Sequence, residues 1–195
     1  MADIRFRHPI RSAWSSLVGP GATPTNTAIT LGLATVGTVA APNLANTWNS
    51  TRSESLTLRL MAFDLWGGAW VNNTKTCARW YERPGQTDTD HLLFAALHLH
   101  PIAVAWLDRR EPRRLPGWLW AGAHYGYLLA ATFAIRRAGP HRRALGPVLT
   151  LAGLALDRAA GPSRAAPWFA PVFYTKLLLG HASAALWPDE ALTPA

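Results

Sequence analysis

The chain has 195 residues, the size of a single domain, and a net charge of +8. Charged residues make up 15% of it, against roughly 25% in soluble domains. Cys77 is the only cysteine, which excludes an intrachain disulfide and argues against a cysteine-based metal site. The mean hydropathy of +0.03 is low for a protein with many membrane spans. The distribution of the charges along the chain therefore has to decide the class.

The charges are clustered. Arginines gather at positions 109–114, 136–143 and 158–164, and the chain between these clusters is almost free of charge. This pattern is typical of apolar membrane spans joined by basic loops. Anionic lipid headgroups explain the arginines without a nucleic acid. A soluble, basic helical protein that binds nucleic acid is therefore the less favoured alternative.

Residues 1–25 form a polar lead-in that is interrupted by Pro and Gly, which resist helix formation. Residues 26–188 are expected to form one transmembrane helical domain, followed by a tail at 189–195. The first apolar span, 27–45, begins after an N-cap at Asn26 or Thr27. Because it consists of Thr, Ala, Gly and Val, we expect it inside the bundle, packed on other helices.

A second helix is predicted at 53–80, capped by Ser53 or Ser55. Its helical periodicity places Asp64 and Asn72 on one polar face. A turn at 84–85 separates it from a third segment, 91–107, for which Asp88 or Asp90 is the expected cap. Pro101 predicts a kink near Leu97.

The clearest membrane signal is 115–135, with 21 uncharged residues. It contains Gly122 and Gly126, four residues apart, which predict close helix packing. The next apolar run, 144–156, is short and interrupted by Gly146-Pro147, so crossing, partial insertion and burial all remain open. The last span, 165–187, carries Lys176 and His181.

The expected fold is an all-α, polytopic transmembrane helical bundle with five or six membrane segments in a prokaryotic plasma membrane. Seven of the ten tryptophans lie near segment ends, as in an aromatic belt: Trp48, Trp80, Trp106, Trp118, Trp120, Trp168 and Trp187. Basic residues are slightly more numerous on the side of the N-terminus, so the positive-inside rule predicts a cytoplasmic N-terminus.

Several polar residues within the apolar segments are candidates for a buried ion, proton or solute pathway: Asp64, Asn72, His98, His124 and Lys176. Asp64 is the sharpest candidate, because a carboxylate at membrane depth is costly and marks a functional site or a structural ion pair. Lys176 and Arg59 are its candidate partners.

Five histidines are candidate ligands of haem or a divalent metal: His91, His98, His100, His124 and His181. His91 and His98 are seven residues apart and share a helix face. His98 and His100 point to nearly opposite sides of a regular helix, so both cannot bind one ion. For each histidine alone, the competing interpretation is a hydrogen-bonded interior residue.

Part of the sequence resembles small prokaryotic multi-pass membrane proteins of unknown function. The resemblance rests on Phe63-Asp64-Leu65-Trp66-Gly67-Gly68, Asn73-Thr74, the run from Arg79 to Gln86, Trp168-Phe169-Ala170-Pro171-Val172 and Lys176-Leu177-Leu178. It covers about a third of the chain and implies a membrane location, without a mechanism.

The leading functional prediction is an integral membrane protein whose buried Asp/His/Lys cluster handles ions, protons or small solutes. One alternative is a membrane enzyme or redox protein that binds haem or a metal through the histidines. Another is a homo-oligomer or an accessory subunit of a larger membrane complex, with Gly122 and Gly126 as the contact. Whether the chain is an enzyme, and on what substrate, stays open.

Overall fold

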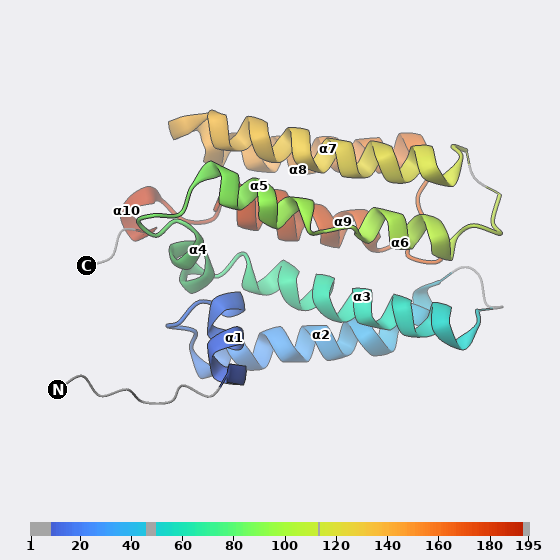
Figure 1. The fold of residues 1–195 in the computed structure, drawn as a ribbon, viewed down its shortest axis with the longest axis horizontal. Coiled ribbons are helices and arrows are strands. Elements are labelled where there is room, and N and C mark those ends of the chain that lie inside the picture. Colours follow the sequence, from blue (N-terminus) through green and yellow to red (C-terminus); the bar gives the residue numbers. More distant parts are fainter. Residues whose placement is uncertain (1–8, 46–49, 113, 193–195) are drawn as a thin grey trace.

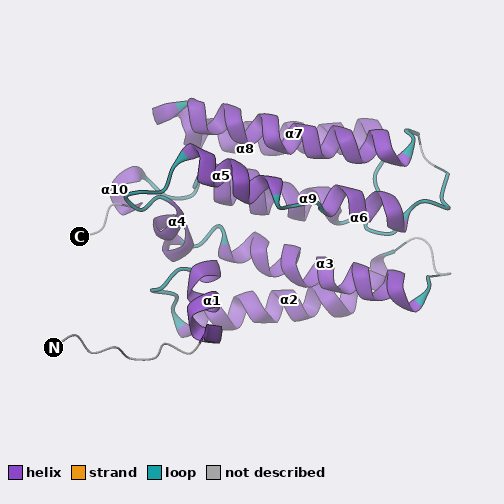
Figure 2. Ribbon diagram, viewed as in Figure 1, coloured by secondary structure: helices purple, strands orange, loops and turns teal. Residues whose placement is uncertain are grey.

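The computed structural model describes residues 9–45, 50–112 and 114–192, and these residues form helices with no strand (Figures 1 and 2). The all-helical prediction is therefore confirmed for this part of the chain. The helices follow in this order: α1 (Pro9–Val18), α2 (Pro24–Leu44), α3 (Arg52–Val71), α4 (Lys75–Tyr81), α5 (Asp88–Ala96), α6 (His100–Leu107), α7 (Gly117–Arg137), the 3₁₀ turn η1 (Gly139–His141), α8 (Arg142–Ala160), α9 (Phe169–Tyr174), the π-helical η2 (Thr175–Ala182) and α10 (Asp189–Leu192).

The long helices run side by side along the long axis of the molecule (Figure 1). The α2–α3 pair forms one side, α7 and α8 form the other, and the α5–α6 and α9–η2 segments lie between them. Helices α1, α4 and α10 gather at the end where both described ends of the chain lie. Segment η2 contacts α3, α4, α5, α7 and α8, so it is the centre of the bundle.

The number of membrane segments was predicted wrongly. Among the described residues, two helical segments, Pro24–Leu44 and Asp88–Leu107, are long and apolar enough to cross a membrane. The 115–135 segment, which was expected to be the clearest span, is not among them: helix α7 is long enough, but Gly, Trp, Tyr and His124 replace aliphatic residues in its first half. Helix α3 carries Arg52, Glu54 and two further charges, and α8 has charged ends and contains Pro147. The finding is weak evidence against a bundle of five or six spans.

Helix α2 lies at the edge of the bundle, so its expected interior position was wrong. Thr23 is its N-cap, rather than Asn26 or Thr27, because the Thr23 hydroxyl accepts a hydrogen bond from the Asn26 N–H at 3.1 Å. The helix packs mainly on α3, and Val36 and Val39 remain more than half exposed. The small residues of α2 allow close packing on α3, but α3 covers only one face of α2 and leaves the other face exposed.

The predicted 53–80 helix is divided into α3 and α4. Thr51 caps α3 through a reciprocal capping box with Glu54, in place of Ser53 or Ser55. The helix ends at Asn72, and the Thr74 side chain starts α4 by accepting a hydrogen bond from the Cys77 N–H at 3.3 Å. The break turns α4 across the end of the bundle, as Figure 1 shows.

The third apolar segment breaks at Leu97–Leu99, where Pro101 predicted a kink. Thr87, rather than Asp88 or Asp90, is the N-cap of α5. In contrast to the prediction for a regular helix, the His98 and His100 rings stack with their centroids 5.5 Å apart. The break therefore brings the two imidazoles to one side.

Two further regions, the N-terminal lead-in and the 144–156 run, also differ from the prediction. The expected lead-in contains the ten-residue helix α1. The 144–156 run is the middle of the 19-residue helix α8, which continues through Pro147. Gly153 lets α8 approach the Tyr174 ring, since a Cβ there would lie 2.6 Å from Tyr174 Cδ2.

Among the described residues, the close packing predicted at Gly122 and Gly126 does not occur. A Cβ at either position would meet nothing within 4 Å. Two of the predicted belt tryptophans, Trp120 and Trp168, are buried in the bundle core, and Trp48 lies outside the described residues.

Candidate functional site

An ion pair joins the centre of the bundle to a pocket on its side. Lys176 Nζ, on η2, lies 2.5 Å from Asp64 Oδ2, on α3. The same oxygen lies 3.2 Å from His100 Nε2, at the start of α6. The Lys176 side chain is 4% exposed, whereas that of Asp64 is 49% exposed. The lysine is therefore buried behind a carboxylate that faces outward, and Asp64 is not the enclosed residue that its predicted role requires.

Glycine and asparagine hold the lysine in place. A Cβ at Gly68 would lie 2.5 Å from Lys176 Cδ and Cε, so the missing side chain makes room for the lysine stem. The Asn72 amide donates a hydrogen bond to the Lys176 carbonyl oxygen at 3.3 Å, and the Asn73 amide donates one to the Thr175 carbonyl oxygen at 3.0 Å. Lys176 also lies in a π-helical segment, a feature that is frequent at functional sites.

The pocket beside this pair has a volume of about 230 Å³. Four aromatic side chains line it, Trp14, Phe63, Tyr81 and Phe94, together with the polar residues Asp64, Asn72, His98 and Lys176. An apolar wall with a few converging polar groups is the usual composition of a small-molecule site.

The histidines fall into two groups. His98 lines the pocket, and His100 lies next to it, against His98 and Asp64. The His98 Nδ1 lies 2.7 Å from the Phe94 carbonyl oxygen, within hydrogen-bond distance. Further toward α4, His181 lies against the Phe94, Tyr81 and His91 rings, with centroid distances of 3.9, 4.4 and 4.7 Å.

His124 lies apart from both groups, between α7, α8 and α9. Its Nδ1 is 2.8 Å from the Tyr174 hydroxyl and its Nε2 is 3.6 Å from Asp157 Oδ1. The structure therefore brings Asp64, Asn72, His98 and Lys176 together and leaves His124 out. Within the described part of the chain, no group of three or more His, Cys, Asp or Glu residues is arranged to hold a metal ion.

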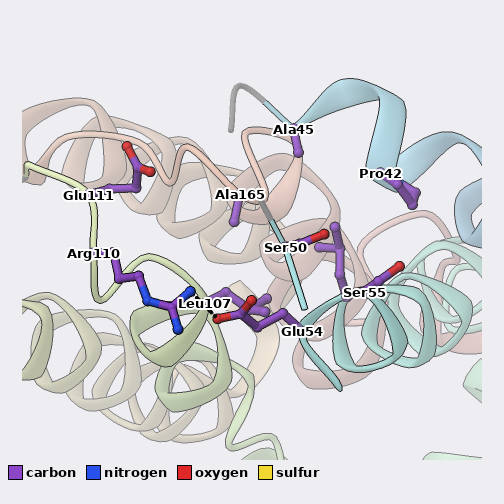
Figure 3. A pocket seen from close by; sticks show the side chains of 10 residues that line it. Pro42, Ala45, Ser50, Glu54, Ser55, Leu107, Arg110, Glu111 and Ala165 are labelled. Atoms are coloured by element: carbon purple, nitrogen blue, oxygen red, sulfur yellow. Dashed lines mark hydrogen bonds and ion pairs between the residues drawn. The ribbon is translucent and has the colours of Figure 1, made fainter. Parts of the chain in front are cut away.

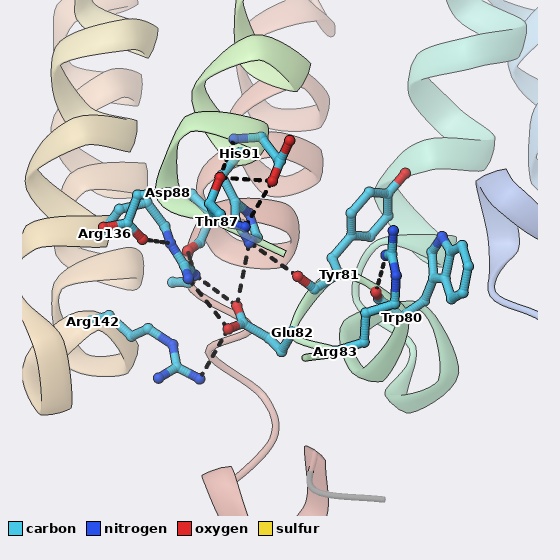
Figure 4. A network of polar contacts seen from close by, with 12 residues as sticks. Trp80, Tyr81, Glu82, Arg83, Thr87, Asp88, His91, Arg136 and Arg142 are labelled. Carbon is cyan, nitrogen blue, oxygen red and sulfur yellow. Dashed lines mark hydrogen bonds and ion pairs between the residues drawn. The ribbon is translucent and has the colours of Figure 1, made fainter. Parts of the chain in front are cut away.

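A charged network closes the α4 end of the bundle. Figure 4 shows Glu82 in contact with Arg136, Arg142 and His91. Arg136 also contacts Asp88, at 3.1 Å. Burial disfavours the charge on Arg136, but the hydrogen bonds and charges of Glu82 and Asp88 outweigh it and raise the pKa of Arg136. This network was not predicted, because its residues are far apart in the sequence.

A second pocket, of about 460 Å³, lies at the opposite end (Figure 3). There Glu54 Oε1 lies 2.5 Å from Arg109 Nη2 and 3.3 Å from Arg110 Nη1. The Glu54 carboxylate also accepts hydrogen bonds from the backbone N–H and the hydroxyl of Thr51. The backbone bond, the hydroxyl and Arg109 together lower the pKa of Glu54 to about 2. Thr51, Arg109 and Arg110 already pair with the Glu54 carboxylate, so it has little capacity left to bind a ligand. This pocket is therefore a weaker candidate for a ligand site than the one beside Asp64.

The chain matches no protein-family model, no curated protein and no solved structure.

Proposed function

We propose that this protein lies in a lipid bilayer and binds a small organic cation at Asp64, in the aromatic-lined pocket beside Lys176. The proposal rests on one observation. The half-exposed carboxylate of Asp64 lies in a pocket on the side of the bundle, and aromatic rings line that pocket. The membrane and the ligand are supported by separate features.

Exposed apolar side chains support the bilayer. At least twenty large apolar side chains are more than a third exposed, among them Leu97, Trp118 and Leu151 at 66–79%. Soluble proteins rarely expose a large continuous apolar surface. The first candidate span has 21 residues, which at 1.5 Å per residue gives about 30 Å, the thickness of the hydrocarbon core. The second has 20 residues and consists of α5 and α6 with the break between them. We propose that these two segments cross the bilayer.

The position of the charges supports the same location. Most charged residues lie in the loops or in the first and last turns of the long helices, where they can reach lipid headgroups. Among the described residues, Arg59, Asp64 and Lys176 lie well inside long helical segments. A charge at this depth is costly, so it is retained where it has a function or a buried partner.

A cation fits this pocket better than an anion does. A ligand that enters from outside meets the half-exposed carboxylate of Asp64 first, because the Lys176 ammonium is almost fully buried. Aromatic faces attract cations, and each contact contributes about 0.5–2 kcal/mol depending on desolvation. Trp14, Phe63, Tyr81 and Phe94 supply such rings at the pocket wall.

The membrane part is tested by extraction. We expect the full chain to stay with the membrane fraction after alkaline carbonate washing and to need detergent for release. Release by carbonate alone would contradict the bilayer proposal.

The ligand part is tested by calorimetry on the full chain in lipid nanodiscs, with benzyltrimethylammonium as the probe. We expect saturable binding of this cation and none of neopentylbenzene, its uncharged isostere. Because Asp64→Asn alone would leave Lys176 unpaired, the informative variant is Asp64→Asn with Lys176→Met, which keeps the interior uncharged. It should bind the cation at least about tenfold more weakly, whereas Glu190→Gln, an exposed carboxylate removed elsewhere, should bind normally. Equal binding by both variants would contradict the proposal.

A further inference from the structure

We infer that binding of the cation at Asp64 releases one proton from the buried Lys176 ammonium to solvent. The inference rests on the proposed function, because it assumes that the cation pairs with Asp64. It adds an exchange: an organic cation enters the pocket and a proton leaves it.

The charge on Lys176 depends on Asp64. The whole lysine residue is 3% exposed, and its ammonium contacts the Asp64 carboxylate. A ligand cation that takes this carboxylate leaves the ammonium buried without its anion. An unpaired buried charge costs several kcal/mol, and a buried lysine avoids the cost by becoming neutral.

The exchange balances in charge and atoms. The ligand brings one positive charge to Asp64, one N–H bond of Lys176 breaks, and the nitrogen keeps the electron pair as a neutral amine. The proton leaves with its positive charge. The pocket therefore holds the same net charge before and after binding, which a low-dielectric interior favours.

Other titratable groups around Lys176 come from each neighbouring element. Asp64 faces it from α3, Cys77 acts on it from α4, and His98 and His100 lie on the α5–α6 segment. His181 follows within η2 itself. Arg136, on α7, acts on His181, and His124 lies with Asp157 around Tyr174 toward α8.

The test counts protons while the cation binds. Benzyltrimethylammonium has no titratable proton, so calorimetry in phosphate and in Tris, two buffers with different ionisation enthalpies, gives the number released by the protein. We expect about one proton per bound cation. Binding with no proton released would overturn the inference and leave the proposed function intact, whereas a lack of binding would defeat the proposed function.

Two variants test the source of the proton. Lys176→Met should bind the cation more tightly and release none. Should this variant fail to fold, Lys176→Arg is the second choice, because arginine keeps its proton. It should bind the cation more weakly than the wild type and also release none. Unchanged proton release in either variant would overturn the assignment to Lys176.

Discussion

Gly68 and Lys176 are directly opposed. A methyl group on Gly68 would lie 2.5 Å from two carbons of the lysine stem and 3.0 Å from its ammonium nitrogen. The lysine reaches Asp64 from η2 only because α3 has no side chain at this position. The glycine is therefore part of the site, although it carries no chemistry of its own.

We predict that Gly68→Ala pushes Lys176 away from Asp64. Overpacking of this kind costs about 1–3 kcal/mol. The matched control is Gly122→Ala, also within a helix, where the added methyl group meets nothing within 4 Å. There the substitution should be neutral or stabilising by up to about 1 kcal/mol, because alanine favours helix. Thermal unfolding in detergent measures both. A Gly68→Ala variant as stable as Gly122→Ala would show that the lysine stem moves at no cost.

A second prediction concerns Phe63, which is 46% exposed and lines the pocket. Phe63→Leu keeps an apolar side chain and removes the ring, so it should weaken benzyltrimethylammonium binding by about two- to fivefold, the equivalent of about 0.5–1 kcal/mol at an exposed ring. Phe133 on α7 is 49% exposed and does not line this pocket, so Phe133→Leu is a matched control and should bind normally. Calorimetric titration measures both, and equal affinities would remove the aromatic part of the argument.

The α4 end supplies a third prediction. Arg136 is 11% exposed, contacts Glu82 and Asp88, and donates a hydrogen bond to the Ala182 carbonyl oxygen at 3.1 Å. Arg136→Met leaves these acceptors without their cation and should lower the free energy of unfolding by about 3 kcal/mol. Its neighbour Arg137 is exposed and lies over the Phe133 ring, so Arg137→Met should cost less than about 1 kcal/mol. Denaturant unfolding of both variants separates the buried network from surface charge.

Local signals in the sequence predicted most of the helices, but not where each of them begins and ends. The break near Leu97 followed from Pro101, since proline removes a backbone donor and clashes one turn back. The division of α3 from α4 was missed because the 53–80 run contains no proline and only Asn72 to Thr74 mark the end. The 144–156 run was predicted shorter than helix α8 because Arg143 and Asp157 mark the ends of the apolar sequence, whereas the helix includes both residues.

The site could be predicted only in part. A carboxylate and a lysine inside apolar segments are visible in the sequence, and they do form a pair. That Lys176 is buried while Asp64 faces outward depends on the packing of η2 against Gly68, which helical periodicity does not contain. The separation of His124 from His98 also depends on which helices are neighbours. Composition likewise suggested too many membrane segments, because apolar residues in α3 and α8 are mixed with charge.

The last prediction concerns the contribution of Glu54 to stability at acidic pH. Contacts with Thr51 and Arg109 lower the pKa of Glu54 from its ordinary 4.5 to about 2. A carboxyl group with a lowered pKa in the folded state stabilises the fold in its ionised form, so this contribution is complete above about pH 4.5 and is lost as the pH falls to about 2. Glu54→Gln lacks it at every pH.

The measurement is therefore a difference between two proteins rather than a single curve, because other carboxyl groups titrate over the same range. Unfolding of the wild type and of Glu54→Gln, followed from pH 6 to pH 2, should show a stability gap that is constant above about pH 4.5 and narrows below it. The exposed residue Glu190 provides the control, since Glu190→Gln should follow the wild type throughout. A gap that does not change with pH would mean that Glu54 contributes through the shape of its side chain in the capping box and not through its charge.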